Sequence, residues 1–208
     1  GWMGQVNREL VVAAQCQVVL KRPLEATQVY FDPHYPGGYG WLFPKGQVAN
    51  VGVGVGLKFQ RDPREALEHL LDRLQIHRRA VIGYTGGLIP CGGPPERTWE
   101  GNIILVGDAA GQTHPITGAG VAHACLCGQL AGRAAAKAAR CGDPGLLGEY
   151  EQEWRDFLGG VLAHALARRR DLDNRWDDDP VALTRALREN WVASVSYTHL
   201  TLPTIYSV

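Results

Sequence analysis

The chain has 208 residues, 45% of them hydrophobic and 20% charged, which is enough to bury a globular core. Lys plus Arg and Asp plus Glu number 21 each, so no overall charge favours nucleic-acid binding. No run reaches the length of a membrane-spanning helix or resembles a secretory signal. We therefore expect a cytoplasmic protein that does not bind nucleic acid.

The cysteines and acidic runs do not form a metal or disulfide pattern. The five cysteines are odd in number, scattered, and lack a C-x-x-C pair. On a helix, Cys125 and Cys127 would point to different faces. The acidic run 177–179 fits a solvated loop. The sequence therefore predicts no metal site and favours buried free thiols in a reducing compartment.

The first half of the chain alternates apolar runs with turn residues and predicts an antiparallel meander. Strands are expected at 10–20, 26–31, 40–43 and 48–57, with a Pro- and Gly-rich turn at 32–38. Leucines at helical spacing predict a helix at 64–74, and a further strand is expected at 80–88.

The second half predicts one strand and several helices. The apolar run Ile103–Val106 has the length and branching of a buried strand, and the Ala-rich segment 121–139 predicts a helix. Further helices are expected from 146 to about 170 and from 181 to 190. We interpret His114 as a solvent-facing turn residue, and the basic run 168–170 as a charged helix end.

A Gly-rich segment joins that strand to the first of these helices and reads G-D-A-A-G-Q-T-H-P-I-T-G-A-G over residues 107–120. Backbone N–H groups at a helix start favour electron-rich oxygens. Asp108 can accept hydrogen bonds from sugar-type hydroxyls, and the glycines allow a flat ring to approach the main chain. The alternative is an ordinary strand–turn–helix connection. The complete ordered string favours a ligand site.

This segment resembles the second flavin-binding motif of FAD-dependent oxidoreductases of the hydroxylase and geranylgeranyl-reductase group. The resemblance implies that Asp108 binds the ribityl chain of FAD, and that Pro115 and residues 118–120 lie against the isoalloxazine ring. The FAD-binding residues implied in this way are Gly107, Asp108, Ala109, Pro115, Gly118, Ala119 and Gly120.

A second motif, Y-G-W-L-F-P at 39–44, is followed after seven residues by Gly52-Val53-Gly54. It is similar to the Y-x-W-x-F-P…G-x-G pattern of geranylgeranyl reductases. The three rings alternate at period two, so on a strand they would share one face and could line a groove for a long apolar substrate. Alternatively they fill the core. The expected substrate-binding residues are Tyr39, Trp41, Phe43, Pro44, Lys45, Gly52 and Gly54.

Flavoproteins of this type begin with a G-x-G-x-x-G fingerprint, which the chain lacks, because Gly52, Gly54 and Gly56 alternate strictly. We therefore expect a fragment that is inactive alone. Residues 195–204 back-translate to a string resembling a transposase-type sequencing adapter, whereas the alternative is a natural β-prone tail. The expected division is a substrate-binding sheet and helix at 1–98, part of the FAD domain at 99–142, helices at 143–194 and a non-native tail at 195–208.

The expected fold class is α+β: an antiparallel substrate-domain sheet, the second-half flavin-binding strand–helix unit and the C-terminal helices of a hydroxylase-like flavoprotein. The resemblance implies an FAD-dependent reductase that saturates C=C bonds of a geranylgeranyl chain on a lipid or chlorophyll-type precursor. NAD(P)H or ferredoxin would supply electrons, with peripheral membrane contact. The alternatives are an aromatic-ring monooxygenase and an inactive remnant. The sequence identifies no catalytic proton donor.

Overall fold

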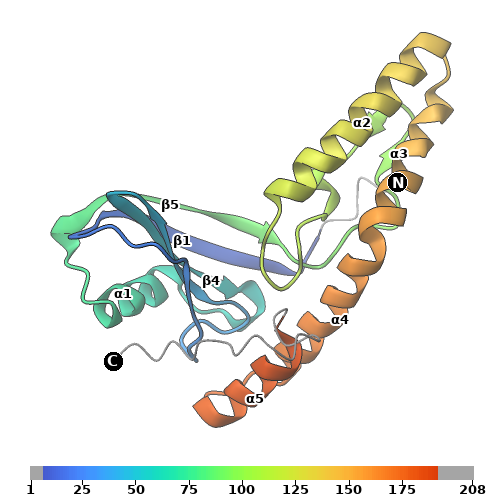
Figure 1. Cartoon of the computed structure of the whole chain (residues 1–208). Coiled ribbons are helices and arrows are strands. Elements are labelled where there is room, and N and C mark those ends of the chain that lie inside the picture. Colours follow the sequence, from blue (N-terminus) through green and yellow to red (C-terminus); the bar gives the residue numbers. More distant parts are fainter. Residues whose placement is uncertain (1–6, 192–208) are drawn as a thin grey trace.

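A five-stranded antiparallel sheet forms most of the first half of the computed structural model, which describes residues 7–191 (Figure 1). Its strands are β1 (Leu10–Val19), β2 (Gln28–Tyr30), β3 (Gly40–Lys45), β4 (Val48–Gly56) and β5 (Val81–Pro90). The expected strands and the α+β class are confirmed.

The order of the sheet, β2-β3-β4-β1-β5, differs from the expected meander. Only β2, β3 and β4 follow one another as neighbours, whereas β1 pairs with β4 on one side and β5 on the other. The physical reason is length: β2 has three residues and cannot pair along the ten residues of β1, whereas β4 and β5 have nine and ten.

Helix α1 (Pro63–Arg73) covers one face of this sheet (Figure 1). It begins where predicted, because the Asp62 side chain accepts a hydrogen bond of 2.8 Å from the Arg64 N–H. Its buried face packs against apolar side chains of β1, β3 and β4 in one hydrophobic cluster that includes Leu42, Val51, Val53, Leu67, Leu70 and Leu71. Alternate strand residues point to the opposite face, which this helix leaves uncovered.

The second half is mainly helical. A hairpin of β6 (Trp99–Glu100) and β7 (Ile103–Ile104) leads through the 3₁₀ turn η4 (Gly107–Ala110) into α2 (Val121–Cys141). The short η5 (Pro144–Leu147) then opens a nearly continuous helical run of α3 (Gly148–Trp154), the π-helical η6 (Arg155–Gly159) and α4 (Gly160–Asn174), followed by α5 (Pro180–Asn190). The predicted helices are confirmed, and Figure 1 shows α2 beside α3.

The buried strand predicted at 103–106 is shorter and more open than expected. Only Ile103 and Ile104 are in strand conformation, and Ile103 is 46% exposed. Within residues 7–191 its partner is the two-residue β6, so no wider sheet encloses it. The prediction of a strand is confirmed, and the prediction of burial is wrong.

The hydrophobic clusters bear on the expected division of the chain. The sheet and α1 form one cluster, whereas α2 and α3 share another, centred on Tyr150 and Trp154. We propose a boundary near residue 98 between these two units. Helices α2 and α3, which lie on either side of the boundary expected at residue 142, share one hydrophobic core. The predicted adapter-derived tail at 195–208 lies outside the described residues.

Two glycines with left-handed backbone angles allow the cost of backbone strain to be compared with the cost of a steric overlap. Gly46 (φ 68°) and Gly111 (φ 61°) have similar backbones, but a Cβ on Gly46 would meet open space, whereas one on Gly111 would overlap the Gly93 carbonyl oxygen. We expect Gly46→Ala to lower the free energy of unfolding by about 1–2 kcal/mol, and Gly111→Ala by roughly 1–3 kcal/mol more. Urea unfolding of both variants measures the difference. Equal losses would show that the Gly93–Gly111 contact is not tight.

Candidate functional site

The Gly-rich loop at 107–120 is held together from within. Gly107, Gly111 and Gly118 all have positive φ angles, and the Gly111 and Gln112 N–H groups donate to the Asp108 and Gly107 carbonyls. The Gly118 N–H donates to the His114 carbonyl at 2.9 Å, which closes a second turn. The loop therefore has a defined shape before any ligand binds.

A buried polar network, which sequence analysis missed, anchors this loop to the helices. The Gln112 side chain is fully buried, accepts from the Gly107 N–H at 2.8 Å and donates to the Tyr150 hydroxyl at 2.9 Å. Tyr150 in turn donates to the Leu105 carbonyl at 2.8 Å. These partners are up to 45 residues apart in the chain, so no local pattern could indicate the network.

The outer surface of the loop is open. Asp108, Ala109 and Ala119 are exposed, and the Thr113 hydroxyl donates a short hydrogen bond to the Asp108 carboxylate. Helix α2 begins after Gly120, and among the described residues no side chain caps its first N–H groups. A carboxylate beside an uncapped helix start can hold a ligand that presents both hydroxyl groups and electron-rich oxygens.

The aromatic residues of the second motif share the sheet face opposite α1, as predicted. Ring centroids of Tyr39 and Trp41 lie 5.8 Å apart, and those of Trp41 and Phe43 lie 6.0 Å apart. The Trp41 indole lies over β4, where a Cβ on Gly52 would overlap it. Its Nε1–H donates to the Gln15 side chain at 3.0 Å. Gly52 therefore gives the indole space to lie close to the sheet.

The motif's aromatic residues do not all have the same surroundings. Tyr39 also packs against Phe31 and Trp191, with centroids 6.3 and 5.3 Å away, so part of the triplet belongs to an aromatic cluster beside α5. Trp41 and Phe43 are half-buried, and Lys45 is exposed at the end of β3. The three rings thus share one face, as predicted, and Tyr39 also packs within an aromatic cluster, as in the alternative interpretation.

The two motifs meet directly. The Tyr39 hydroxyl donates to the Thr117 carbonyl of the Gly-rich loop at 2.5 Å. A small cavity of about 30 Å³ lies at this junction, lined by residues of both motifs, among them Tyr39, Trp41, Gly54, Pro115 and Gly118. Phe43, Pro44 and Lys45 do not line it. The structure therefore brings together two motifs that the sequence analysis treated separately.

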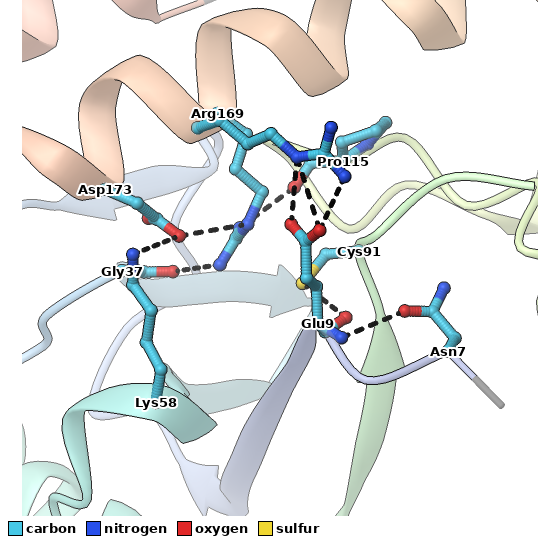
Figure 2. Close-up of polar contacts among 9 residues, drawn as sticks. Asn7, Glu9, Gly37, Lys58, Cys91, Pro115, Arg169 and Asp173 are labelled. Atoms are coloured by element: carbon cyan, nitrogen blue, oxygen red, sulfur yellow. Dashed lines mark hydrogen bonds and ion pairs between the residues drawn. The ribbon is translucent and has the colours of Figure 1, made fainter.

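Arg169 of α4 joins the Gly-rich loop to the turn before β3 (Figure 2). The residue is only 5% exposed, and its guanidinium donates to the Pro115 carbonyl and to the Gly37 carbonyl, both at 2.9 Å. Asp173 lies 3.6 Å from its Nε, and Lys58 lies 3.3 Å from the same carboxylate. The interpretation of 168–170 as a charged helix end is wrong for Arg169, because α4 continues to Asn174 and places this side chain inward.

Burial sets the protonation of several groups near the junction. Burial raises the pKa of Tyr39 and raises that of Cys91 to about 11, so both keep their protons at neutral pH. Burial also lowers the pKa of His114, which is half-buried and accepts from the Thr117 N–H at 3.3 Å. The expectation of a solvent-facing His114 is therefore wrong. Burial raises the pKa of Asp173, against the lowering effect of Arg169 and Lys58.

Comparison with known proteins identifies close sequence relatives. A family model for the geranylgeranyl reductase catalytic domain matches residues 11–89. The chain is 38% identical over 178 residues to digeranylgeranylglycerophospholipid reductase 2 of Methanothermobacter thermautotrophicus, covering 83% of this chain and 46% of that protein. It is 39% identical over 160 residues to the Methanocaldococcus jannaschii digeranylgeranylglycerophospholipid reductase, covering 74% and 41%. The chain thus spans less than half the length of these curated relatives.

Solved structures show the same fold. A geranylgeranyl bacteriochlorophyll reductase-like protein of Thermoplasma acidophilum superposes with a TM-score of 0.70 at 22% identity, covering 91% of this chain and 54% of that one. A probable FAD-dependent monooxygenase of Pseudomonas aeruginosa superposes with a TM-score of 0.55 at 20% identity, covering 85% and 51%. Among residues 7–191, no helix has the length and apolar character needed to cross a membrane.

The two hydrogen bonds of Arg169 lead to a stability prediction. Arg169→Met would leave the Asp173 carboxylate without its guanidinium and two loop carbonyls without donors, so we expect a loss of about 3–5 kcal/mol in the free energy of unfolding. The matched control is Arg170→Met, whose ion pair with Glu9 is exposed and should contribute less than about 1 kcal/mol. Urea unfolding compares the two. Similar small losses in both variants would contradict a central role for Arg169.

Proposed function

Because the chain belongs to the geranylgeranyl reductase family, we propose that it is part of an FAD-dependent enzyme that saturates C=C bonds of an isoprenoid lipid chain. The observation that carries this proposal is the junction at Tyr39, whose hydroxyl donates to the Gly-rich loop while its ring lies beside the open aromatic face. One residue thus contacts both the proposed cofactor segment and the proposed substrate face.

The loop surface fits a flavin nucleotide. We propose that Asp108 accepts hydrogen bonds from the ribityl hydroxyls, that Ala109 lies beside it on the exposed surface, and that Gly107 supports it from the buried side of the turn. Pro115 and residues 118–120 would contact the ring, near the uncapped start of α2. When bound, the flavin supplies hydride-transfer chemistry. The residues of this chain bind and orient it.

The sheet face supports an apolar, extended substrate. Trp41 and Phe43 provide aromatic surface, Gly52 allows Trp41 to lie close to β4, and a Cβ on Gly83 or Gly87 would meet open space. An isoprenoid chain has no polar groups along its length, so contact with such a surface excludes water and holds the alkene in place. We propose that Tyr39, Trp41, Phe43, Pro44, Gly52 and Gly54 form this surface, and that Lys45 contacts the polar head group.

The relatives named above are digeranylgeranylglycerophospholipid reductases, and we propose a substrate of that class for this chain. Such a lipid resides in a bilayer, so we propose a cytoplasmic enzyme with peripheral membrane contact. NAD(P)H or ferredoxin is the proposed electron donor. The described residues offer no group that we assign as proton donor to the second alkene carbon.

Cofactor binding is tested in a chimera in which this chain replaces its matched segment in the Methanothermobacter relative. The chimera should bind FAD, and Asp108→Ala should weaken binding by about 1.5–3 kcal/mol because charge-assisted hydrogen bonds are lost. Fluorescence titration with FAD measures this. The control Asp156→Ala, on the exposed surface of η6, should bind like the parent. Equal FAD affinity in both variants would contradict the assignment of Asp108.

Substrate binding is tested with Trp41→Ala in the same chimera, measuring both unfolding and reduction of a digeranylgeranyl glycerophospholipid. A fully buried aromatic ring would cost about 3–5 kcal/mol on truncation, whereas we expect a folded variant with impaired turnover. The control Tyr84→Ala removes an exposed ring from β5, on the face opposite Trp41, and should keep full turnover.

Three outcomes would oppose this part of the proposal. If Trp41→Ala unfolds, the ring is core. If it folds and reduces the lipid at the parent rate, the substrate lies elsewhere. If the parent chimera hydroxylates a phenolic compound and reduces no alkene, the monooxygenase alternative is correct.

A further inference from the structure

A cluster outside the flavin and substrate motifs brings Asp32, His34 and His69 together. Asp32 and His34 belong to the turn after β2, whereas His69 projects from α1, 35 positions farther along the chain. His34 Nδ1 lies 2.6 Å from Asp32 Oδ1, and His69 Nε2 lies 3.5 Å from Asp32 Oδ2. The two imidazole rings stack with centroids 3.9 Å apart.

We propose that Asp32, His34 and His69 form a binding site for a divalent first-row transition metal such as Zn²⁺. One ligand atom from each residue lies within 4.8 Å of the other two. In a tetrahedral zinc site with metal–ligand distances near 2 Å, neighbouring ligand atoms are about 3.3 Å apart. The His34 side chain, 62% exposed, can close that difference by turning about its side-chain bonds, because no packed core restrains it.

The ligand atoms are available for metal binding. His69 Nε2 is buried and, within residues 7–191, has no hydrogen-bond partner, so its lone pair is not used in a hydrogen bond. Imidazole nitrogens and a carboxylate oxygen are common ligand types for such metals, and the three residues supply them.

The Arg73 guanidinium also contacts this carboxylate, with Nη1 3.0 Å from Asp32 Oδ2. It does not contact Oδ1, which accepts from the His34 backbone N–H at 3.0 Å and keeps a second lone pair for the metal. In metal sites the second oxygen of a ligating carboxylate is commonly held by such an outer hydrogen bond, which orients the first. Arg73 can therefore remain in place as a supporting group when the metal replaces the proton between Asp32 and His34.

The surroundings favour a cation. A cavity of about 560 Å³ opens beside the cluster, and its lining includes Asp32, His34, Arg61, Asp62, Glu65 and Asp178. Four carboxylates face one guanidinium there, so the cavity attracts positive ions. Two imidazole nitrogens and one carboxylate oxygen suit Zn²⁺ and its neighbours better than Mg²⁺ or Ca²⁺, which prefer oxygen ligands. This inference is independent of the proposed reductase function and departs from the metal-free expectation of the sequence.

The position of the site suggests what the metal does. It would tie the turn at 32–38 to α1, on the sheet face opposite Trp41. That turn includes Gly37, whose carbonyl accepts from Arg169. Because a ligand that binds only the folded state stabilises it by mass action, Zn²⁺ should raise the melting temperature of the chain.

The test uses the 208-residue chain after removal of metals with a chelator. Titration calorimetry with Zn²⁺ should show one saturable site, and Mg²⁺ should not compete for it. His34→Gln and His69→Gln should each lower Zn²⁺ affinity at least tenfold, whereas His164→Gln, on the exposed surface of α4, should leave it unchanged. Absence of saturable binding, or equal affinity in all three variants, would overturn the proposal.

A second measurement needs no substitution and covers the case in which a variant fails to fold. The visible spectrum of the intact chain with Co²⁺ should contain d–d bands from nitrogen and oxygen ligands. Thiolate-to-cobalt charge transfer would show that the exposed cysteines, Cys125 or Cys141, bind the metal instead, and would overturn the assignment.

Discussion

The geometry of the site depends on one buried guanidinium. Arg169 lies 54 residues from Pro115 and 132 from Gly37, yet it donates to both carbonyls. A carbonyl in a buried loop needs a donor, and an arginine has a planar group that can serve two acceptors at fixed separation. Because one acceptor belongs to the Gly-rich loop and the other to the turn before β3, the position of either segment constrains the other. The Asp173 carboxylate supplies the opposite charge that makes burying this guanidinium tolerable, and Lys58 pairs with the same carboxylate.

The two faces of the sheet have different roles, and the alternation of valine and glycine along β4 explains how one strand serves both. Its valines, Val51, Val53 and Val55, point to α1 and are fully or almost fully buried. The alternate positions are glycines, and at Gly52 the missing side chain is where the Trp41 indole lies. The same strand thus builds a hydrophobic core on one side and leaves space for a flat aromatic surface on the other.

Local patterns in the sequence predicted the structural features that depend on residues close together in the chain. The period-two alternation of β3 correctly indicated that Tyr39, Trp41 and Phe43 share a face, and the leucine spacing correctly indicated the helix α1. The sheet order was missed because consecutive strands were assumed to pair, and β1 instead pairs with strands long enough to match it.

Contacts between distant segments could not be predicted in this way. Arg169 stands in a run of three arginines, and its sequence neighbours Arg168 and Arg170 are on more exposed positions of α4. Arg169 differs from these two arginines only because of the direction in which α4 crosses the loop. Gln112 likewise has no local signal of its role, which depends on Tyr150 of α3. His69 showed no sign of a partner, because Asp32 and His34 reach it through the packing of α1 on the sheet.

The Gly-rich loop combines a fixed interior with an open exterior, and this combination is what a cofactor site requires. Tyr150 of α3 holds the loop through Gln112, Arg169 of α4 holds it through the Pro115 carbonyl, and Tyr39 holds it through the Thr117 carbonyl. None of these contacts uses the exposed side of Asp108. Binding energy is lost when a ligand must first order the loop that receives it. Here three separate elements have already ordered the main chain, so the exposed carboxylate and the start of α2 can act on a ligand directly. The substrate face is fixed by the same contacts, because the Tyr39 hydroxyl that orients the loop belongs to the ring that borders Trp41.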